Sequence, residues 1–181
     1  VIRDHLQISM PSDLGRNQML GWLDRFQCRY PDVSLRIQLS DRLADIYRQP
    51  VDIAIRYGRL ADSGLVALPL LPDNRRVLCA APAYLARAGN PASPTDLARH
   101  NCLRYQLADD VHEQWHFFRE REEISVAVGG NRVSDDGDAV RRWAIGGFGV
   151  ANKSQLDVIA DLRSGRLVRL CPEWSGEAAP L

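Results

Sequence analysis

Short runs of alternating apolar and polar residues, separated by segments with helical spacing, most strongly constrain the fold of this chain. In the clearest run, residues 33–39, every second residue is Val, Ile or Leu. Side chains two apart share one face of a strand, so this run predicts a half-buried strand. Residues 6–10 show the same period, and residues 12–30 carry apolar side chains at helical spacing before Pro31. This order predicts a strand–helix–strand unit of an α/β sheet.

The same pattern continues along the chain. Ser40 and Asp41 precede a predicted short helix that reaches Arg48, and alternating residues then predict strands over 51–55 and 66–70. Further strands are predicted over residues 77–81, 102–105, 115–118, 124–128, 146–151 and 167–170. Further helices are predicted over residues 83–88, 95–99 and 155–163, and after the cap signal Ser134-Asp135-Asp136. The chain thus predicts an α/β protein throughout.

The length and the net charge limit the number of domains and the classes of function that this chain can have. The 181 residues are enough for one domain or two small ones. Lys and Arg total 23, as do Asp and Glu, so the chain lacks the basic excess of a nucleic-acid-binding domain. We therefore do not expect this chain to bind DNA itself.

The cysteines and the apolar runs indicate the cellular compartment in which the protein works. The four cysteines form no Cys-x-x-Cys pair, which argues against a zinc knuckle or a redox motif. Their even number permits disulfides, but buried thiols in a reducing cytosol fit the wide spacing equally well. No apolar run approaches the roughly 20 residues of a membrane span, and no signal peptide opens the sequence. We expect a cytoplasmic protein without membrane contact.

About a dozen short motifs occur along nearly the whole chain in a recognisable order. They include Leu6-Gln7-Ile8-Ser9, Tyr30-Pro31-Asp32-Val33, Leu39-Ser40-Asp41, Val51-Asp52-Ile53-Ala54-Ile55-Arg56-Tyr57-Gly58, Asp62-Ser63, Arg76-Val77-Leu78-Cys79-Ala80-Ala81-Pro82-Ala83-Tyr84-Leu85, His100-Asn101-Cys102, Gly149-Val150-Ala151 and Gly165-Arg166-Leu167-Val168. In this order they resemble the effector-binding domain of bacterial LysR-type transcription regulators.

The resemblance implies an α/β fold of the periplasmic-binding-protein type II kind. Two Rossmann-like subdomains, residues 1–70 plus 152–181 and residues 71–151, would be joined by two crossover strands around a ligand cleft. The resemblance implies a small-molecule sensor that is not an enzyme, needs no cofactor and forms a homodimer or homotetramer. DNA would be bound only through a winged helix-turn-helix outside this chain. Asn152-Lys153-Ser154 replaces the apolar residue and proline frequent in the family, so hinge behaviour near the second crossover is expected to differ.

The expected cleft lies beyond the carboxyl ends of the strands, where helix N-termini present free N–H groups. We expect effector contacts from Ser9, Ser12, Ser40, Arg56, Tyr57, Ala80, Asp135 and Gly149. The serines would supply hydroxyl contacts, and Arg56 is the best candidate cation for a carboxylate effector.

Other roles stay open for these residues. Ser12 and Ser40 could simply cap helices, and Arg56 could pair with Asp52 or Asp62. Four acidic residues near the expected cleft mouth argue against a strongly anionic ligand unless they point outward: Asp13, Asp41, Asp135 and Asp136. A polar neutral or zwitterionic ligand would also fit. Trp22, off the main stripe of the first helix, could contact a second subunit or the core.

Two alternative functions remain at this point. The segment His112-Glu113-Gln114-Trp115-His116 matches the zinc-protease motif H-E-x-x-H, with Asp135 or Asp136 as a third ligand. However, Trp115 and Phe117 alternate as in a strand, where the two histidines would stand about 13 Å apart, too far for one metal. The other alternative is a secreted periplasmic solute-binding protein of the same fold. We favour the regulator.

Overall fold

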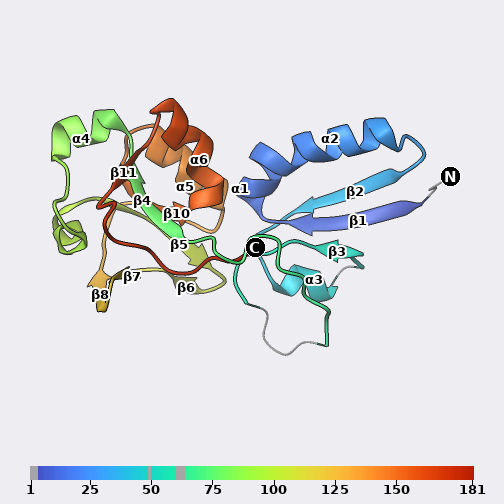
Figure 1. Ribbon diagram of the computed structural model, residues 1–181, viewed down its shortest axis with the longest axis horizontal. Helices are drawn as coiled ribbons and strands as arrows, with labels where there is room; N and C mark the ends of the chain where they lie inside the picture. Colours follow the sequence, from blue (N-terminus) through green and yellow to red (C-terminus); the bar gives the residue numbers. More distant parts are fainter. Residues whose placement is uncertain (1–3, 49, 60–63) are drawn as a thin grey trace.

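The computed structural model describes residues 4–48, 50–59 and 64–181, which form two groups of elements side by side (Figure 1). We call the group built on the three-stranded sheet the first lobe. Its three strands pair in parallel in the order β2-β1-β3. The bounds are β1 His5–Met10, β2 Ser34–Leu39, β3 Ile53–Ala54, α1 Ser12–Leu14, a π-helical turn Gly15–Met19, α2 Leu20–Arg29 and α3 Ala44–Arg48.

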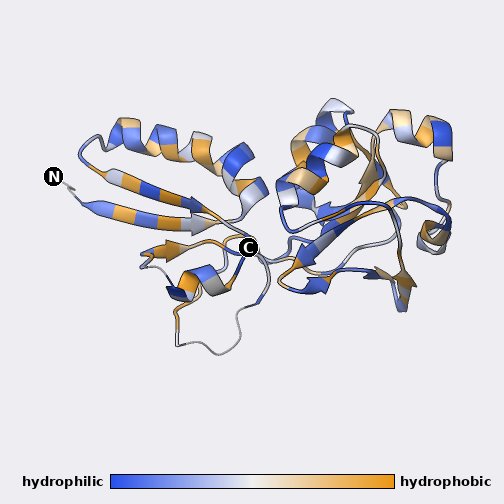
Figure 2. Cartoon of the chain, turned by 180° about the vertical axis from the view of Figure 1, so that it is seen from behind, coloured by the Kyte–Doolittle hydropathy of each residue, from blue (hydrophilic) through white to orange (hydrophobic). Residues whose placement is uncertain are grey.

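The predicted strand–helix–strand unit of the first lobe is confirmed. Ile8 is 4% exposed, and Met10 and Leu14 are fully buried between the sheet and the helical segment above it. Alternate residues of β2 pack against this core, and Figure 2 shows the alternation along both long strands. The helix ends at Arg29, before Pro31, as expected because the residue before proline avoids helical angles.

The second lobe is built on a six-stranded sheet in the order β11-β4-β10-β5-β6, with β9 also paired to β5. Its strands are β4 Arg76–Ala80, β5 Cys102–Leu107, β6 Asp110–Val111, β9 Val133–Ser134, β10 Val150–Ser154 and β11 Val168–Leu170. Its helices are α4 Pro82–Ala88, a 3₁₀ helix Pro94–Arg99, α5 Gly137–Ile145 and α6 Gln155–Ser164. A separate hairpin is formed by β7 Gln114–Arg119 and β8 Glu122–Ala127.

Strand β4 separates the two cores of the second lobe. Leu78 and Ala80 face one core, while Val77 and Cys79 face the other. Because both faces are covered, the strand is a nearly continuous apolar run. All four cysteines are free thiols, and only Cys28 is exposed.

Two chain segments connect the lobes, and they run antiparallel to each other (Figure 1). The Arg76 N–H donates to the Glu177 carbonyl at 2.8 Å, and the Ala179 N–H donates to the Asn74 carbonyl at 2.8 Å. Closer to the first lobe, the Leu181 N–H donates to the Leu71 carbonyl at 3.1 Å. The connections therefore form a short two-stranded ribbon.

Strand pairing differs from the expected division at residue 152. β10 pairs antiparallel with β4 from Ala151–Cys79 to Ser154–Arg76, and β11 pairs with the other edge of β4. Strands β10 and β11 thus belong to the sheet of the second lobe, although most of their residues lie beyond 152. The sequence pattern predicts these strands but does not say which neighbour each will pair with.

The predicted strand over residues 66–70 is wrong. Residues 65–69 form no strand or helix, and Val66 and Leu68 are 91% and 77% exposed. Alternation produces a strand only where a neighbouring strand supplies hydrogen bonds, and the described residues offer none here. Among the described residues, no helix is both long and apolar enough to cross a membrane.

Candidate functional site

A cavity of about 150 Å³ lies between the two lobes. Both lobes and the connecting ribbon contribute to its wall. The lining residues are Pro11, Asp13, Asp41, Leu43, Arg56, Tyr57, Arg76, Tyr105, Leu107, Gly137, Val140, Asn152, Lys153, Ser154, Asp157 and Ala179. Such a mixed apolar and polar wall between two lobes is typical of small-molecule sites.

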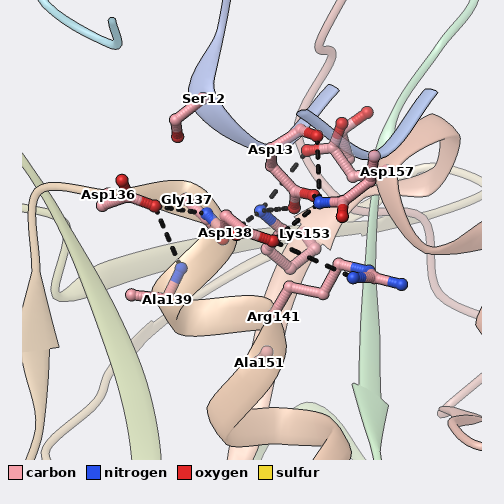
Figure 3. Close-up of polar contacts among 12 residues, drawn as sticks. Ser12, Asp13, Asp136, Gly137, Asp138, Ala139, Arg141, Ala151, Lys153 and Asp157 are labelled. Carbon is pink, nitrogen blue, oxygen red and sulfur yellow. Dashed lines mark hydrogen bonds and ion pairs between the residues drawn. The ribbon is translucent and has the colours of Figure 1, made fainter. Parts of the chain in front are cut away.

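At one side of the cavity, Lys153 joins the lobes through a buried group of charges (Figure 3). It is the only lysine in the sequence, and it is 6% exposed. Its Nζ lies 2.6 Å from Asp13 Oδ2 and 3.4 Å from Asp157 Oδ2, and it donates to the Gly137 carbonyl at 2.8 Å. The Tyr57 hydroxyl donates to Asp157 Oδ1 at 2.6 Å. We call Lys153, Asp13, Asp157 and Tyr57 the Lys153 cluster.

The N-terminus of α5 forms a second contact between the lobes. Asp41 of the first lobe accepts from the Gly137 N–H at 2.9 Å and from the Ser12 hydroxyl at 2.7 Å. Its other oxygen accepts from the Ser12 N–H at 2.8 Å. A carboxylate at this position is favoured by the free N–H groups and by the positive end of the helix dipole.

Two more first-lobe side chains reach the same helix. Arg16 Nη1 and Asn17 Nδ2 donate to the two carboxylate oxygens of Asp138 at 3.0 Å and 2.6 Å. Despite partial burial, the bonds from Asn17, Arg142 and Arg16 hold the pKa of Asp138 below its usual value. The lobes are therefore joined by charged and polar contacts, to which Leu156 of α6 adds an apolar contact with the core of the first lobe.

Burial shifts the protonation equilibria of the Lys153 cluster. It raises the pKa of Asp13 to about 6, with Asp157 adding to the rise and Lys153 opposing it. It also raises the pKa of Tyr57, with the Asp157 carboxylate adding to the effect. Burial alone would lower the pKa of Lys153, but Asp157 and Asp13 together raise it. Lys153 therefore stays charged while Asp13 titrates in mildly acidic solution.

The titration of Asp13 predicts a pH dependence of stability. A carboxyl with a raised pKa binds its proton more readily in the folded state, so it stabilises the fold at low pH. That contribution is lost as the pH rises from 3.8 to about 6. Across this window, the unfolding free energy of the unaltered protein relative to Asp13→Asn is expected to fall by about 1–3 kcal/mol. Urea denaturation at a series of pH values measures it.

The exposed α2 carboxylate Asp24 provides the matched control, Asp24→Asn, for this series. The quantity to follow is the unfolding free energy of the unaltered protein minus that of Asp13→Asn. If it stays constant or increases as the pH rises from 3.8 to about 6, the raised pKa of Asp13 is contradicted.

Arg56 also lines the cavity. Its Nη1 donates to the Ile55 carbonyl at 2.7 Å, and its Nη2 donates to the Ser9 hydroxyl at 2.6 Å. Burial lowers its pKa, against the attraction of Asp41 and Asp45. No ion pair of Arg56 is found among the described residues, and Asp62, one expected partner, lies outside them together with Ser63.

Comparison with known families agrees with this two-lobed architecture. The model of the LysR substrate binding domain matches residues 1–181. The chain belongs to the LysR substrate-binding domain family. This family consists of transcription regulators rather than enzymes.

Relatives of this LysR domain are also transcription regulators. It is 34% identical over 173 residues to the HTH-type transcriptional activator TtdR of Escherichia coli UTI89, matching 96% of this chain and 56% of TtdR. It is also 34% identical over 169 residues to the HTH-type transcriptional regulator DmlR of E. coli K12, matching 93% of this chain and 55% of DmlR. The chain thus spans little more than half of these relatives. They do not support a secreted solute-binding protein.

Solved structures of LysR-type regulators share the fold. CrgA from Neisseria meningitidis superposes with a TM-score of 0.85 at 26% identity, covering 98% of this chain and 60% of CrgA. Full-length AphB from Vibrio cholerae, at 22% identity, superposes with a TM-score of 0.83 over 99% of this chain and 60% of AphB. The expected fold, of the periplasmic-binding-protein type II kind, is confirmed.

The structure places the expected effector contacts of this LysR domain in three settings. Arg56 and Tyr57 line the cavity. Ser9, Ser12 and Ser40 are not among the lining residues, but Ser9 accepts from the lining residue Arg56 and Ser12 donates to the lining residue Asp41. Ser40 donates to Asp45 Oδ2 at 2.6 Å and accepts from the Arg42 N–H. The serine hydroxyls therefore position charged side chains of the first lobe.

The remaining expected contacts do not line the cavity. Ala80 is fully buried in the β4 core. Asp135 is exposed and lies 3.8 Å from Arg42 Nη2. Its neighbour Asp136 caps α5 by accepting from the Asp138 and Ala139 N–H groups, as the cap signal predicts. Gly149 is buried, and a Cβ there would collide with the Asn101 carbonyl oxygen.

Gly149 therefore has a packing requirement that can be tested. Gly149→Ala is expected to lower the unfolding free energy by about 1–3 kcal/mol, because the obstructing atom belongs to the backbone and cannot rotate away. Gly129→Ala is the matched control, because a Cβ at Gly129 would meet nothing within 4 Å. Urea denaturation compares the two. Equal stabilities of the two variants would refute this assignment.

Of the residues that line the cavity, only Arg56 and Tyr57 were predicted as site residues. Those not predicted include the polar residues Arg76, Tyr105, Asn152, Lys153 and Asp157. Asn152 and Lys153 stand in the segment that departs from the family pattern. That departure is the only signal in the sequence that could have directed attention to them.

The H-E-x-x-H segment is extended rather than helical. Gln114–Arg119 is strand β7, and Trp115 and Phe117 are each 1% exposed, which confirms the predicted alternation. His112 Nε2 lies 3.2 Å from Glu177. The described residues contain no group of three metal-ligating side chains. The geometry that a zinc protease requires of this motif is not formed.

Proposed function

We propose that this chain is the effector-sensing regulatory part of a LysR-type transcription regulator. The observation that carries the proposal is the cavity between the lobes, whose wall takes residues from both lobes and from the connecting ribbon. A small molecule bound there contacts both lobes at once. It favours one arrangement of the lobes by its difference in affinity for the available arrangements.

The two lobes act as the two subdomains in this proposal. The first comprises the described residues up to 71, the second runs from residue 75 to about 175, and the ribbon joins them. DNA is bound by a winged helix-turn-helix in the part of the regulator outside this chain. The regulator works in the cytoplasm as a homodimer or homotetramer, and Trp22 of α2, 45% exposed, is available for a subunit contact.

A thermal-shift screen of the purified chain against a metabolite library tests the sensor function. A ligand that binds only the folded state at about 100 times its Kd adds about 2.7 kcal/mol of stability. At least one compound is therefore expected to raise the melting temperature in a saturable way. The same compound should change the DNA affinity of the full-length regulator. A library without any stabilising compound would contradict the proposal.

A further inference from the structure

The acidic side chains on the cavity wall all have partners within the protein. Asp41 accepts three hydrogen bonds, from Ser12 and Gly137. Asp157 accepts from Tyr57 and lies beside Lys153. Asp13 accepts from Asn17 at 2.9 Å and pairs with Lys153. Their negative charge is therefore already compensated, and it weighs less against an anionic ligand than the sequence suggests.

Neither arginine on the wall donates a hydrogen bond to a carboxylate among the described residues. Within the described part of the chain, Arg56 donates to the neutral oxygens of Ile55 and Ser9, and its buried Nε has no hydrogen-bond partner there. Arg76 Nη1 donates to the Asn152 carbonyl at 3.0 Å, and the nearest carboxylate oxygen, of Glu177, lies 3.9 Å from Arg76 Nε. A guanidinium group in such a setting has donors left for an anionic oxygen.

Asn152 adds a second, independent observation. Asn152 is only 5% exposed, and neither the nitrogen nor the oxygen of its side-chain amide has a hydrogen-bond partner among the described residues. Asn152 lines the cavity beside Arg76. A buried amide without hydrogen bonds is unfavourable, and such groups in native proteins usually have a partner that the isolated chain lacks.

We propose that the effector of this cavity is a small carboxylate, whose oxygens are bound by Arg56 and Arg76 and whose adjacent polar group bonds to the Asn152 amide. The inference rests on the proposed sensor function and adds the chemical class of the ligand. The planar guanidinium fork matches a carboxylate in shape and charge.

The test compares small carboxylic acids with their own primary amides in thermal-shift and calorimetric titrations of the purified chain, at matched ionic strength. At least one acid is expected to bind, while its amide, equal in shape but neutral, binds at least about tenfold more weakly. This comparison uses the unaltered protein, so it does not depend on whether a variant folds.

Arginine variants then locate the contact. Arg56→Gln and Arg76→Gln are each expected to raise the Kd of that acid by about ten- to one-hundredfold. Arg121→Gln removes an equal charge from the exposed turn of the β7–β8 hairpin and should leave the Kd unchanged.

The outcomes separate the two proposals. If amides or other neutral compounds bind as well as the acids, or if the acid binds equally to both cavity variants, the carboxylate assignment is overturned and the sensor function stands. If no acid, no amide and no library compound binds, the sensor function fails, and the ligand class fails with it.

Discussion

Replacing Lys153 by methionine is expected to lower the free energy of unfolding by about 3–5 kcal/mol. Methionine fills similar volume, so the loss is mainly electrostatic. Without the ammonium, the carboxylates of Asp13 and Asp157, 2% and 7% exposed, face each other without a compensating charge. The Gly137 carbonyl loses its hydrogen bond from Nζ as well. Urea denaturation at neutral pH measures the loss.

A double variant separates charge from packing. Asp13→Asn removes one of the two carboxylates, so Lys153→Met combined with Asp13→Asn should recover part of the stability lost in Lys153→Met alone. The single variant should also become markedly more stable as the pH falls, because protonated carboxyls need no counter-charge. If Lys153→Met loses less than about 1 kcal/mol, the cluster does not hold the lobes together.

Trp115→Ala is expected to cost about 3–5 kcal/mol of unfolding free energy. Trp115 of β7 is 1% exposed and packs in the core of the second lobe. Its indole N–H also donates to the His112 carbonyl at 3.0 Å, a bond that fixes the start of the hairpin. Truncation leaves a cavity that this paired hairpin cannot easily close.

The neighbouring variant His116→Ala is the control for Trp115→Ala. His116 lies on the opposite face of β7 and is partly exposed, so its loss should cost less than about 1 kcal/mol. Unfolding of both variants is followed by urea denaturation, with and without a metal chelator. A large loss in His116→Ala, or an effect of the chelator on the unaltered protein, would restore the metal-site interpretation of this segment.

Local patterns predict most of the fold because they reflect local physics. The helical segment after Pro11, the buried run of β4 and the Asp136 cap depend on near neighbours in the sequence. Which strands pair, in contrast, depends on segments that are far apart in the sequence. The alternation at Val66 and Leu68 has the same form as that of β2, yet only β2 has a neighbouring strand to pair with.

The candidate site is predictable only in part for the same reason. Arg56 stands out because a cation follows a strand at the expected cleft. Lys153 does not, because lysines are mostly exposed and its burial depends on Asp13, 140 residues away in the sequence. The missing partners of the Asn152 amide can be recognised only once the atoms around it are placed.

Because Lys153 is the only lysine of this chain, its reaction with an amine-specific reagent can be used to follow the separation of the two lobes. Apart from the terminal amine, an acylating reagent has one amine to attack, and that amine is closed off between Asp13, Asp157 and Gly137. Because Asp13 belongs to the other lobe, separation of the lobes would remove this cover, and the rate of Nζ acylation is expected to rise with the frequency of such separations. Any compound that holds the halves together will slow the reaction, whatever its own chemistry.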